Sequence, residues 1–253
     1  MPITDLIIAG IAALGAGFVN AIAGGGTLIT FPTLIALGLP PITANITNTI
    51  ALSPGFLGGT FAQRKDFESQ KQRLFKILPV CIAGGIVGGV LLINNSENSF
   101  KTLIPYLLLI ATFFLAIQVP LKKLISSKST KETPAFLKNF GMYALLFLAS
   151  VYGGYFGAGL GVILMAILGL IINETLTKLN VLKQAISFCI NCTAAIYFSF
   201  TGQVEWTFAF VMIFGSISGG IIGGKLAGKI NPEILRWVIV SIGIVLSIYY
   251  FLK

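Results

Sequence analysis

The stretch Gly17–Asn48, GFVNAIAGGGTLITFPTLIALGLPPITANITN, is an apolar sequence that glycine and proline interrupt twice. A helical pattern breaks at Gly24–Gly26, resumes at Thr27 and ends again at Pro40. Each glycine lowers helix stability by about 1 kcal/mol relative to alanine, so three in a row favour an unwound segment. Unwound backbone has no hydrogen-bond partners in lipid and must be buried in protein or line a water-filled cavity. The stretch therefore predicts a helix that is interrupted inside the protein.

The composition is that of a protein embedded in a lipid bilayer. Only 10% of the 253 residues are charged and 56% are hydrophobic, whereas soluble domains carry about 25% charged residues. The apolar segments lie at 5–23, 27–39, 44–62, 74–93, 102–121, 137–156, 160–172, 180–201, 206–228 and 234–252. They predict an all-α polytopic membrane protein. The net charge of +9 comes from short connectors, a pattern typical of cytoplasmic loops that argues against nucleic-acid binding.

Basic residues are distributed unevenly among the connectors. The connectors 64–76 and 122–138 hold five each and 225–236 holds three, whereas 94–101 holds one and 201–206 none. Because positive charge favours the cytoplasmic side, we expect the first three connectors to be cytoplasmic. Both termini are then non-cytoplasmic, and the second half of the chain runs opposite to the first.

A shift of 135 residues superposes separated motifs of the two halves. It places Ala23, Gly24 and Gly26 on Ala158, Gly159 and Gly161, Asn45 on Asn180, and GGIVGG (84–89) on GGIIGG (219–224). Repetition with reversed orientation predicts two inverted-topology repeats with a site at their interface. Residues 1–121 form the first repeat, 122–136 a cytoplasmic linker and 137–253 the second repeat.

Each repeat is expected to contain a glycine-broken, re-entrant helical hairpin and three transmembrane helices. The segments 27–39 and 160–172 are too short to cross about 30 Å of hydrocarbon, and each follows a glycine-rich break. The two GGxxGG motifs are interpreted as close helix-packing surfaces.

The residues near the breaks favour an anion as ligand. The helix that resumes at Thr27 is expected to aim unpaired N–H groups and a positive dipole end at the site. Under the shift, Asn48 falls on Lys183, and Asn180 shares the helical face of Lys183. Lys183 either snorkels to the membrane surface or faces the site as a buried cation.

Other kinds of site lack the residues that they need. All eight acidic residues lie at or near predicted loops, and there is no histidine, so a proton relay and a cation site are both unsupported. The three cysteines lie in apolar segments and provide no zinc ligand set. With no nucleophile–base pair and no phosphate loop, we expect neither an enzyme nor a cofactor. What remains suits a small oxyanion such as sulfite or a sulfonate.

The motifs AGFVNAIAGGGTLITFPTLIALGLPPITANITN, GGYFGAGLGVILMAILGL and KLNVLKQ resemble those of the sulfite exporter TauE/SafE family of TSUP-type membrane permeases. The resemblance covers essentially the whole chain and implies an eight-segment carrier in a bacterial or archaeal inner membrane. Many relatives carry Asn where this chain has Gln184. The expected substrate-binding residues are Asn20, Gly24, Gly25, Gly26, Thr27, Asn45, Thr47, Asn48, Tyr155, Gly157, Gly159, Gly161, Asn180 and Lys183.

The resulting hypothesis is a secondary transporter or facilitator that exports a small sulfur-containing anion across the cytoplasmic membrane. The site lies between the repeats and is reached by alternating access. The alternatives are an anion channel, a carrier for another small organic anion, and a membrane scaffold that transports nothing. The expected partners are the anion and the bilayer, and a second copy of the chain is a candidate partner in a homodimer.

Overall fold

A computed structural model describes residues 2–127, 135–172, 174–227 and 229–252. The elements in these ranges are α1 (Ile3–Ile22), α2 (Thr27–Ala36), α3 (Pro41–Ala62), α4 (Arg64–Phe67), the 3-10 turn η1 (Glu68–Gln70), α5 (Lys71–Ile93), α6 (Glu97–Ser127), α7 (Ala135–Tyr155), α8 (Leu160–Ile171), α9 (Leu176–Ser199), α10 (Trp206–Leu226) and α11 (Pro232–Leu252). Within the described ranges, six helices are long and apolar enough to cross a membrane. The expected all-α polytopic class is thereby confirmed.

The glycine breaks separate long helices from short ones. Between α1 and α2, Gly24 and Gly25 have φ angles of 87° and 91°. Between α7 and α8, Gly157 and Gly159 have φ angles of 74° and 71°. These left-handed conformations are favourable for glycine and strained for other residues. The helices that follow, α2 and α8, have only 10 and 12 residues.

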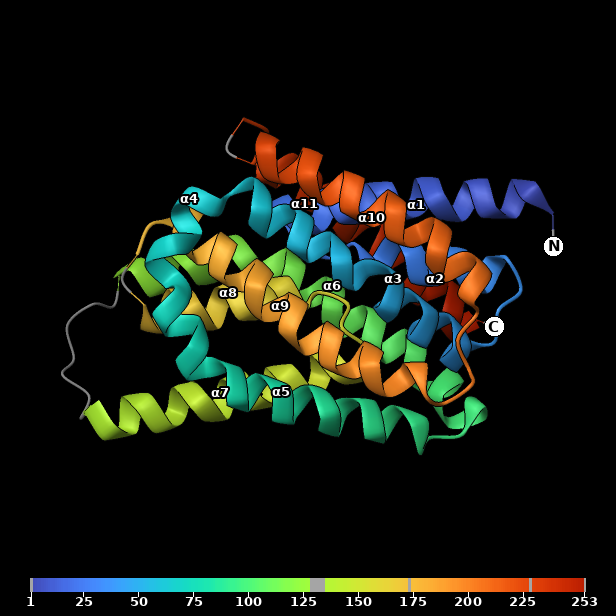
Figure 1. Cartoon of the computed structure of the whole chain (residues 1–253), viewed down its shortest axis with the longest axis horizontal. Helices are drawn as coiled ribbons and strands as arrows, with labels where there is room; N and C mark the ends of the chain where they lie inside the picture. Colours follow the sequence, from blue (N-terminus) through green and yellow to red (C-terminus); the bar gives the residue numbers. More distant parts are fainter. Residues whose placement is uncertain (1, 128–134, 173, 228, 253) are drawn as a thin grey trace.

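The two halves interlock. The helix α10 packs along α1 and α3, whereas α5 packs along α7 and α9; α3 also meets α9, and α6 meets α11. Figure 1 shows the long helices running roughly along the long axis of the molecule. The first turn of α1 and the last turn of α11 lie at one end, and α4 lies at the opposite end.

The starts of the helices in the two halves follow two different offsets. The starts of α9, α10 and α11 follow those of α3, α5 and α6 by 135 residues. The start of α8 follows that of α2 by only 133. The amides of Gly24 and Gly157 each donate to a carbonyl five residues earlier, at 2.9 and 3.1 Å. Counted from the helix starts, Gly24 corresponds to Gly157 and Gly26 to Gly159. The stretch from the start of α8 to the start of α9 is two residues longer than that from α2 to α3.

The polar connector after α3 is helical, not an irregular loop. It forms α4 and η1 and runs directly into α5 at Lys71. Its long charged and amide side chains are good helix formers, and Lys71 forms an ion pair with Glu68 at 2.8 Å. Similarly, α6 continues to Ser127 and α7 begins at Ala135, so both enter the stretch 122–136 expected as a linker.

The GGxxGG motifs of α5 and α10 lie in close contacts between the halves, which confirms their packing role. A Cβ on Gly88 of α5 would lie 2.1 Å from the carbonyl oxygen of Val151 in α7. A Cβ on Gly219 of α10 would lie 2.0 Å from that of Leu14 in α1. Small residues let membrane helices approach this closely.

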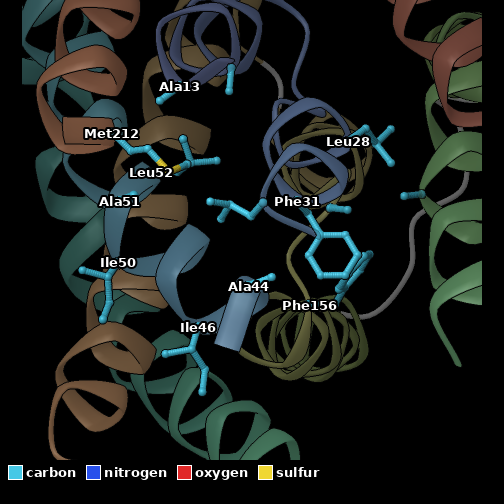
Figure 2. Packing of buried hydrophobic residues seen from close by; sticks show 14 of the residues in the cluster. Ala13, Leu28, Phe31, Ala44, Ile46, Ile50, Ala51, Leu52, Phe156 and Met212 are labelled. Carbon is cyan, nitrogen blue, oxygen red and sulfur yellow. The ribbon is translucent and has the colours of Figure 1, made fainter. Parts of the chain in front are cut away.

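An aromatic cluster fixes the second break against α2. The ring centroids of Phe31 in α2 and Phe156 in the break lie 5.2 Å apart, edge to face. Phe100 of α6 lies 6.4 Å from Phe31, and all three side chains are fully buried. Figure 2 shows the rings of Phe31 and Phe156 side by side in the core. The cluster holds the short helix of one half on the break of the other.

The close approach of α1 and α10 predicts that Gly17→Ala destabilises the protein. A Cβ there would lie 2.2 Å from the carbonyl oxygen of Ser216, and such overpacking costs about 1–3 kcal/mol. The midpoint of thermal unfolding in detergent should fall. The control is Gly15→Ala on the same helix, where nothing lies within 4 Å of the added carbon; its midpoint should stay or rise. Equal midpoints for the two variants would contradict the packing argument.

Candidate functional site

The two glycine breaks are in direct contact. A Cβ on Gly24 would lie 3.5 Å from the amide nitrogen of Val162 and 3.6 Å from the carbonyl carbon of Gly161. A Cβ on Gly161 would in turn lie 3.6 Å from the Cα of Gly24. The fold thus brings together, backbone against backbone, two interruptions that are far apart in the sequence.

Lys183 of α9 lies beside this contact and is buried. Only 2% of the residue is exposed, which contradicts the snorkelling interpretation. Its Nζ donates to the carbonyl oxygen of Asn20 at 3.3 Å. Its Cδ lies 3.5 Å from the position that a Cβ on Gly161 would take. None of the ion pairs between described residues includes Lys183, so the ammonium group lies between the two breaks without a carboxylate.

Asn20, in the last turns of α1, closes the first break. Its Oδ1 accepts a hydrogen bond of 2.7 Å from the amide of Gly26. This bond satisfies one of the free N–H groups that precede a helix start. The side chain of Asn20 therefore stabilises the break, while its carbonyl holds Lys183.

Fewer backbone amides are free at the helix starts than expected. In α2, the amides of Leu28 and Ile29 bond to the carbonyls of Gly25 and Gly26, at 3.0 and 2.9 Å. Within the described chain, the amides of Thr27 in α2 and Gly161 in α8 donate to no carbonyl. One free amide at each helix start remains for a ligand.

Two further predicted residues lie close to the breaks. The hydroxyl of Thr30 in α2 donates to Oδ1 of Asn48 in α3. The Nδ2 of Asn180, one turn before Lys183, donates to the carbonyl of Ala21 at 3.1 Å and to Oε1 of Gln63 at 3.2 Å. Amide side chains of α3 and α9 therefore connect these helices to the arms of the first break.

Another group of predicted residues lies towards the end that carries the α5–α6 and α9–α10 connectors. The Nδ2 of Asn45 donates to the carbonyl of Tyr155 at 2.8 Å, and the hydroxyl of Tyr155 accepts from Asn95 at 2.7 Å. The hydroxyl of Thr47 accepts from the amide of Glu205 at 3.0 Å. These side chains hold the ends of helices together and are not linked to Lys183.

The remaining glycines of the breaks face different neighbours. A Cβ on Gly25 would lie 2.8 Å from Leu115 of α6, and one on Gly159 would lie 3.3 Å from the backbone of Ala111, also in α6. Gly157 is close to α9, where Oδ1 of Asn191 lies 3.6 Å from the added carbon. Gly25 and Gly159 therefore serve close packing against α6.

The structure adds residues that the sequence analysis did not include. The buried side-chain atoms Nε2 of Gln63, both amide atoms of Gln184 and Oγ of Ser187 have no hydrogen-bond partner. Gln184 is 1% exposed and lies against α3, with Nε2 2.6 Å from the position of a Cβ on Gly59. Buried polar groups without partners are rare in proteins, so these atoms are available to a polar ligand.

The spacing of polar residues along α9 is a sequence signal that could have identified Gln184 and Ser187. Asn180, Gln184, Ser187 and Asn191 follow one another at intervals of three or four residues and therefore share one face of α9. All four are buried. Taken one at a time, such residues are explained by bonds between helices; taken together, they form a polar stripe that starts beside Lys183.

Ion pairs anchor the start of α9. Glu174 accepts from Arg73 at 2.9 Å and from Lys178 at 3.1 Å. Hydrogen bonds from Arg73 and then Lys178 hold the pKa of Glu174 below its usual value. The pairing connects the start of α5 to the helix that carries Lys183.

Among the described residues, no three His, Cys, Asp or Glu side chains gather in a way that could hold a metal ion.

The arrangement around Lys183 is closed to solvent. Asn20, Asn48, Asn180 and Gln184 are all between 1% and 9% exposed. The region around the two breaks contains an ammonium group, backbone amides that donate to no carbonyl and unpaired side-chain amides, all of which are hydrogen-bond donors. A ligand reaches it only if the surrounding helices move.

Comparison with known proteins identifies a family and several relatives. The profile of the family described as "Sulfite exporter TauE/SafE" matches residues 9–250. A "Probable membrane transporter protein" of Haemophilus influenzae is 30% identical over 203 residues, covering 80% of this chain and 77% of that protein. "Probable membrane transporter protein ORF9" of Sinorhizobium is 28% identical and YfcA of Escherichia coli 25% identical, covering 94% and 93% of this chain and 89% and 85% of those proteins. No solved structure shows a significant match.

Removal of the cap on the first break should loosen it locally. In Asn20→Ala the amide of Gly26 loses its acceptor, and a buried donor without a partner costs about 1–3 kcal/mol. Hydrogen exchange measured by mass spectrometry should become faster in peptides that cover residues 23–28. The control is Asn94→Ala, since Asn94 is exposed and its side chain bonds only within its own helix. Unchanged exchange in Asn20→Ala would show that the break does not depend on this bond.

Proposed function

Because the chain belongs to the sulfite exporter TauE/SafE family of membrane transporters, we propose that it carries a small sulfur-containing oxyanion out of the cell. The ligand class is sulfite or an organic sulfonate, and the mode is secondary transport. The observation that carries the proposal is the buried ammonium group of Lys183 beside the two touching breaks. A buried cation without a carboxylate partner favours an anionic ligand.

The charges and hydrogen-bond donors around Lys183 support an anionic ligand. In the described part of the chain, no Asp or Glu is among the buried polar residues. Gly161, whose amide donates to no carbonyl, lies beside the side chain of Lys183, and the adjacent Gln184 has an unpaired side-chain amide. A sulfite or sulfonate group has three oxygen atoms that accept several hydrogen bonds at once. A cationic substrate would be repelled by the ammonium group of Lys183 and would find no buried carboxylate among the described residues.

The inverted repeat is part of the proposal. The contacts support it, because α10 meets α1 and α3 as α5 meets α7 and α9. The constant offset of 135 residues from α3 to α6 supports it as well. We assign 1–121 to the first repeat, 122–136 to the linker and 137–253 to the second. In this arrangement α2 and α8 are re-entrant arms whose starts meet near the middle of the membrane.

Alternating access is the proposed route by which a ligand reaches the closed site. The breaks meet at Gly24 and Gly161, and the two arms belong to different halves, so a tilt of one half against the other separates them. Lys183 is held to Asn20 by a single hydrogen bond of 3.3 Å, which an entering oxyanion can replace. The substrate then bridges the ammonium group and the free amides until the opposite side opens.

We propose the orientation of the protein in the membrane from the position of the basic connector 64–76. The connector 64–76 lies at the end of α4, opposite to the first turn of α1 and the last turn of α11, so the termini are placed outside the cytoplasmic membrane. In a variant without native cysteines, a membrane-impermeant maleimide on intact cells should label Ser96→Cys and not Ser69→Cys. Both positions are exposed, and lysed cells provide the labelling control. The reverse pattern would overturn the orientation.

The decisive experiment is flux in proteoliposomes loaded with labelled sulfite or a sulfonate. Lys183→Ala should lower the flux roughly tenfold or more, since a hydrogen bond to a charged group contributes about 1.5–3 kcal/mol and about 1.4 kcal/mol corresponds to a factor of ten. The control Lys65→Ala removes an exposed charge at the basic end and should leave the flux near wild type. Unchanged flux in the double variant Lys183→Ala, Asn48→Ala would exclude these residues from the mechanism. Counterflow in the wild type separates a carrier from a channel.

A further inference from the structure

Arg236 of α11 is a second buried cation, outside the site described above. The residue is 5% exposed, and its Nε and Nη1 atoms have no hydrogen-bond partner. None of the ion pairs between described residues includes it. Glu233, one turn earlier on α11, is exposed and forms no ion pair with it. Arginine is almost never buried without a partner, and an unpaired buried charge is strongly destabilising.

Arg236 contacts an aromatic ring of its own helix. The guanidinium carbon lies 5.2 Å from the ring centroid of Trp237. A ring attracts the flat face of a guanidinium group and offers no lone pair to its N–H edge. The contact therefore orients the group and leaves Nε and Nη1 unsatisfied. Because Trp237 is 53% exposed, its fluorescence also reports on what binds there.

Arg236 lies between the basic end of the molecule and the first break. Ile239, three residues later and on the same face of α11, approaches the break: its Cγ2 lies 3.3 Å from the position of a Cβ on Gly25. The face that carries both residues packs on α6 and α2. Towards the start of α11, the chain leads back to exposed Lys225 and Lys229. An anion at Arg236 therefore lies beside the first break, on its basic side.

We propose that Arg236 binds an oxyanion through its guanidinium N–H groups, of which Nε–H and Nη1–H are buried without a partner. Nε–H and Nη1–H lie on opposite sides of the guanidinium group, and each forms a fork with the Nη2 group between them. Such a fork matches two oxygens of a sulfonate, sulfite or phosphate group. One source of this chemistry is the transported anion, held at the basic end before or after it occupies the Lys183 site; this source rests on the proposed function. The other source is the phosphate of an anionic lipid in the adjacent leaflet.

The test uses Trp237 as the reporter. The full chain with Trp206→Phe retains Trp237 as its one tryptophan and is placed in phosphatidylcholine nanodiscs. Sulfite and, separately, sulfate are titrated at constant ionic strength set with chloride. A saturable change in emission is expected, with the dissociation constant raised about tenfold or more in Arg236→Gln. Arg236→Lys retains the charge without the fork and should lie between the two; it also serves if Arg236→Gln does not fold.

The control is Arg64→Gln. Arg64 also lies over an aromatic ring, 5.3 Å from the centroid of Phe61, but it is exposed, so its loss should leave the titration unchanged.

A second set of nanodiscs contains phosphatidylglycerol and distinguishes the two sources. If sulfite saturates the signal in phosphatidylcholine, the transported anion is the ligand. If the signal instead follows phosphatidylglycerol and ignores sulfite, the lipid phosphate is the ligand. If neither probe changes the emission in an Arg236-dependent way, the proposal is wrong. Binding is measured without flux, so a protein that binds sulfite at Arg236 but does not transport it would overturn the proposed function alone.

Discussion

The backbone of the two glycine breaks is the constraint on which the structure depends. Lipid offers no hydrogen bonds, so each interrupted helix needs partners within the protein. The first break obtains one from Oδ1 of Asn20, which accepts from the amide of Gly26 at 2.7 Å. The second obtains one from the hydroxyl of Tyr152, which donates to the carbonyl of Ala158 at 2.6 Å. In both cases a polar side chain from the preceding helix closes the break.

Burial of these breaks requires helices that approach closely. Apolar side chains gain little by leaving lipid for protein, so membrane helices associate through close packing of small residues. The GGxxGG motifs of α5 and α10 provide this packing, and each motif faces two helices of the other half at once. The interlocked arrangement places α9 against α3 at the centre. Lys183 is buried because its helix is enclosed in this way.

Local features could be predicted from the sequence, and features that depend on neighbours could not. Glycine runs and apolar length predict the breaks and the helices, because both act within a few residues. The connector 64–76 was expected to be a loop, but its charge does not prevent helix formation. The burial of Lys183 depends on α1 and α8, which no local pattern reveals. The stretch from the start of α8 to the start of α9 is two residues longer than that from α2 to α3, a difference that a gapless shift does not include. Gln184 and Ser187 are not among the expected binding residues, because their shared position on one face of α9 is visible only when the polar residues of the helix are compared with one another.

Two buried cations near one break have a consequence for the transport cycle. Lys183 lies beside Gly161, and Arg236 lies one turn from the contact of Ile239 with Gly25. Low dielectric strengthens the attraction of each cation for an anion and raises the penalty for leaving it unpaired. An oxyanion bound at either cation therefore stabilises the closed arrangement more than an open one in which that cation meets water. A ligand shifts a conformational equilibrium by its difference in affinity for the two states. On the proposed function, the charge of the substrate itself drives the closure of the helices around it.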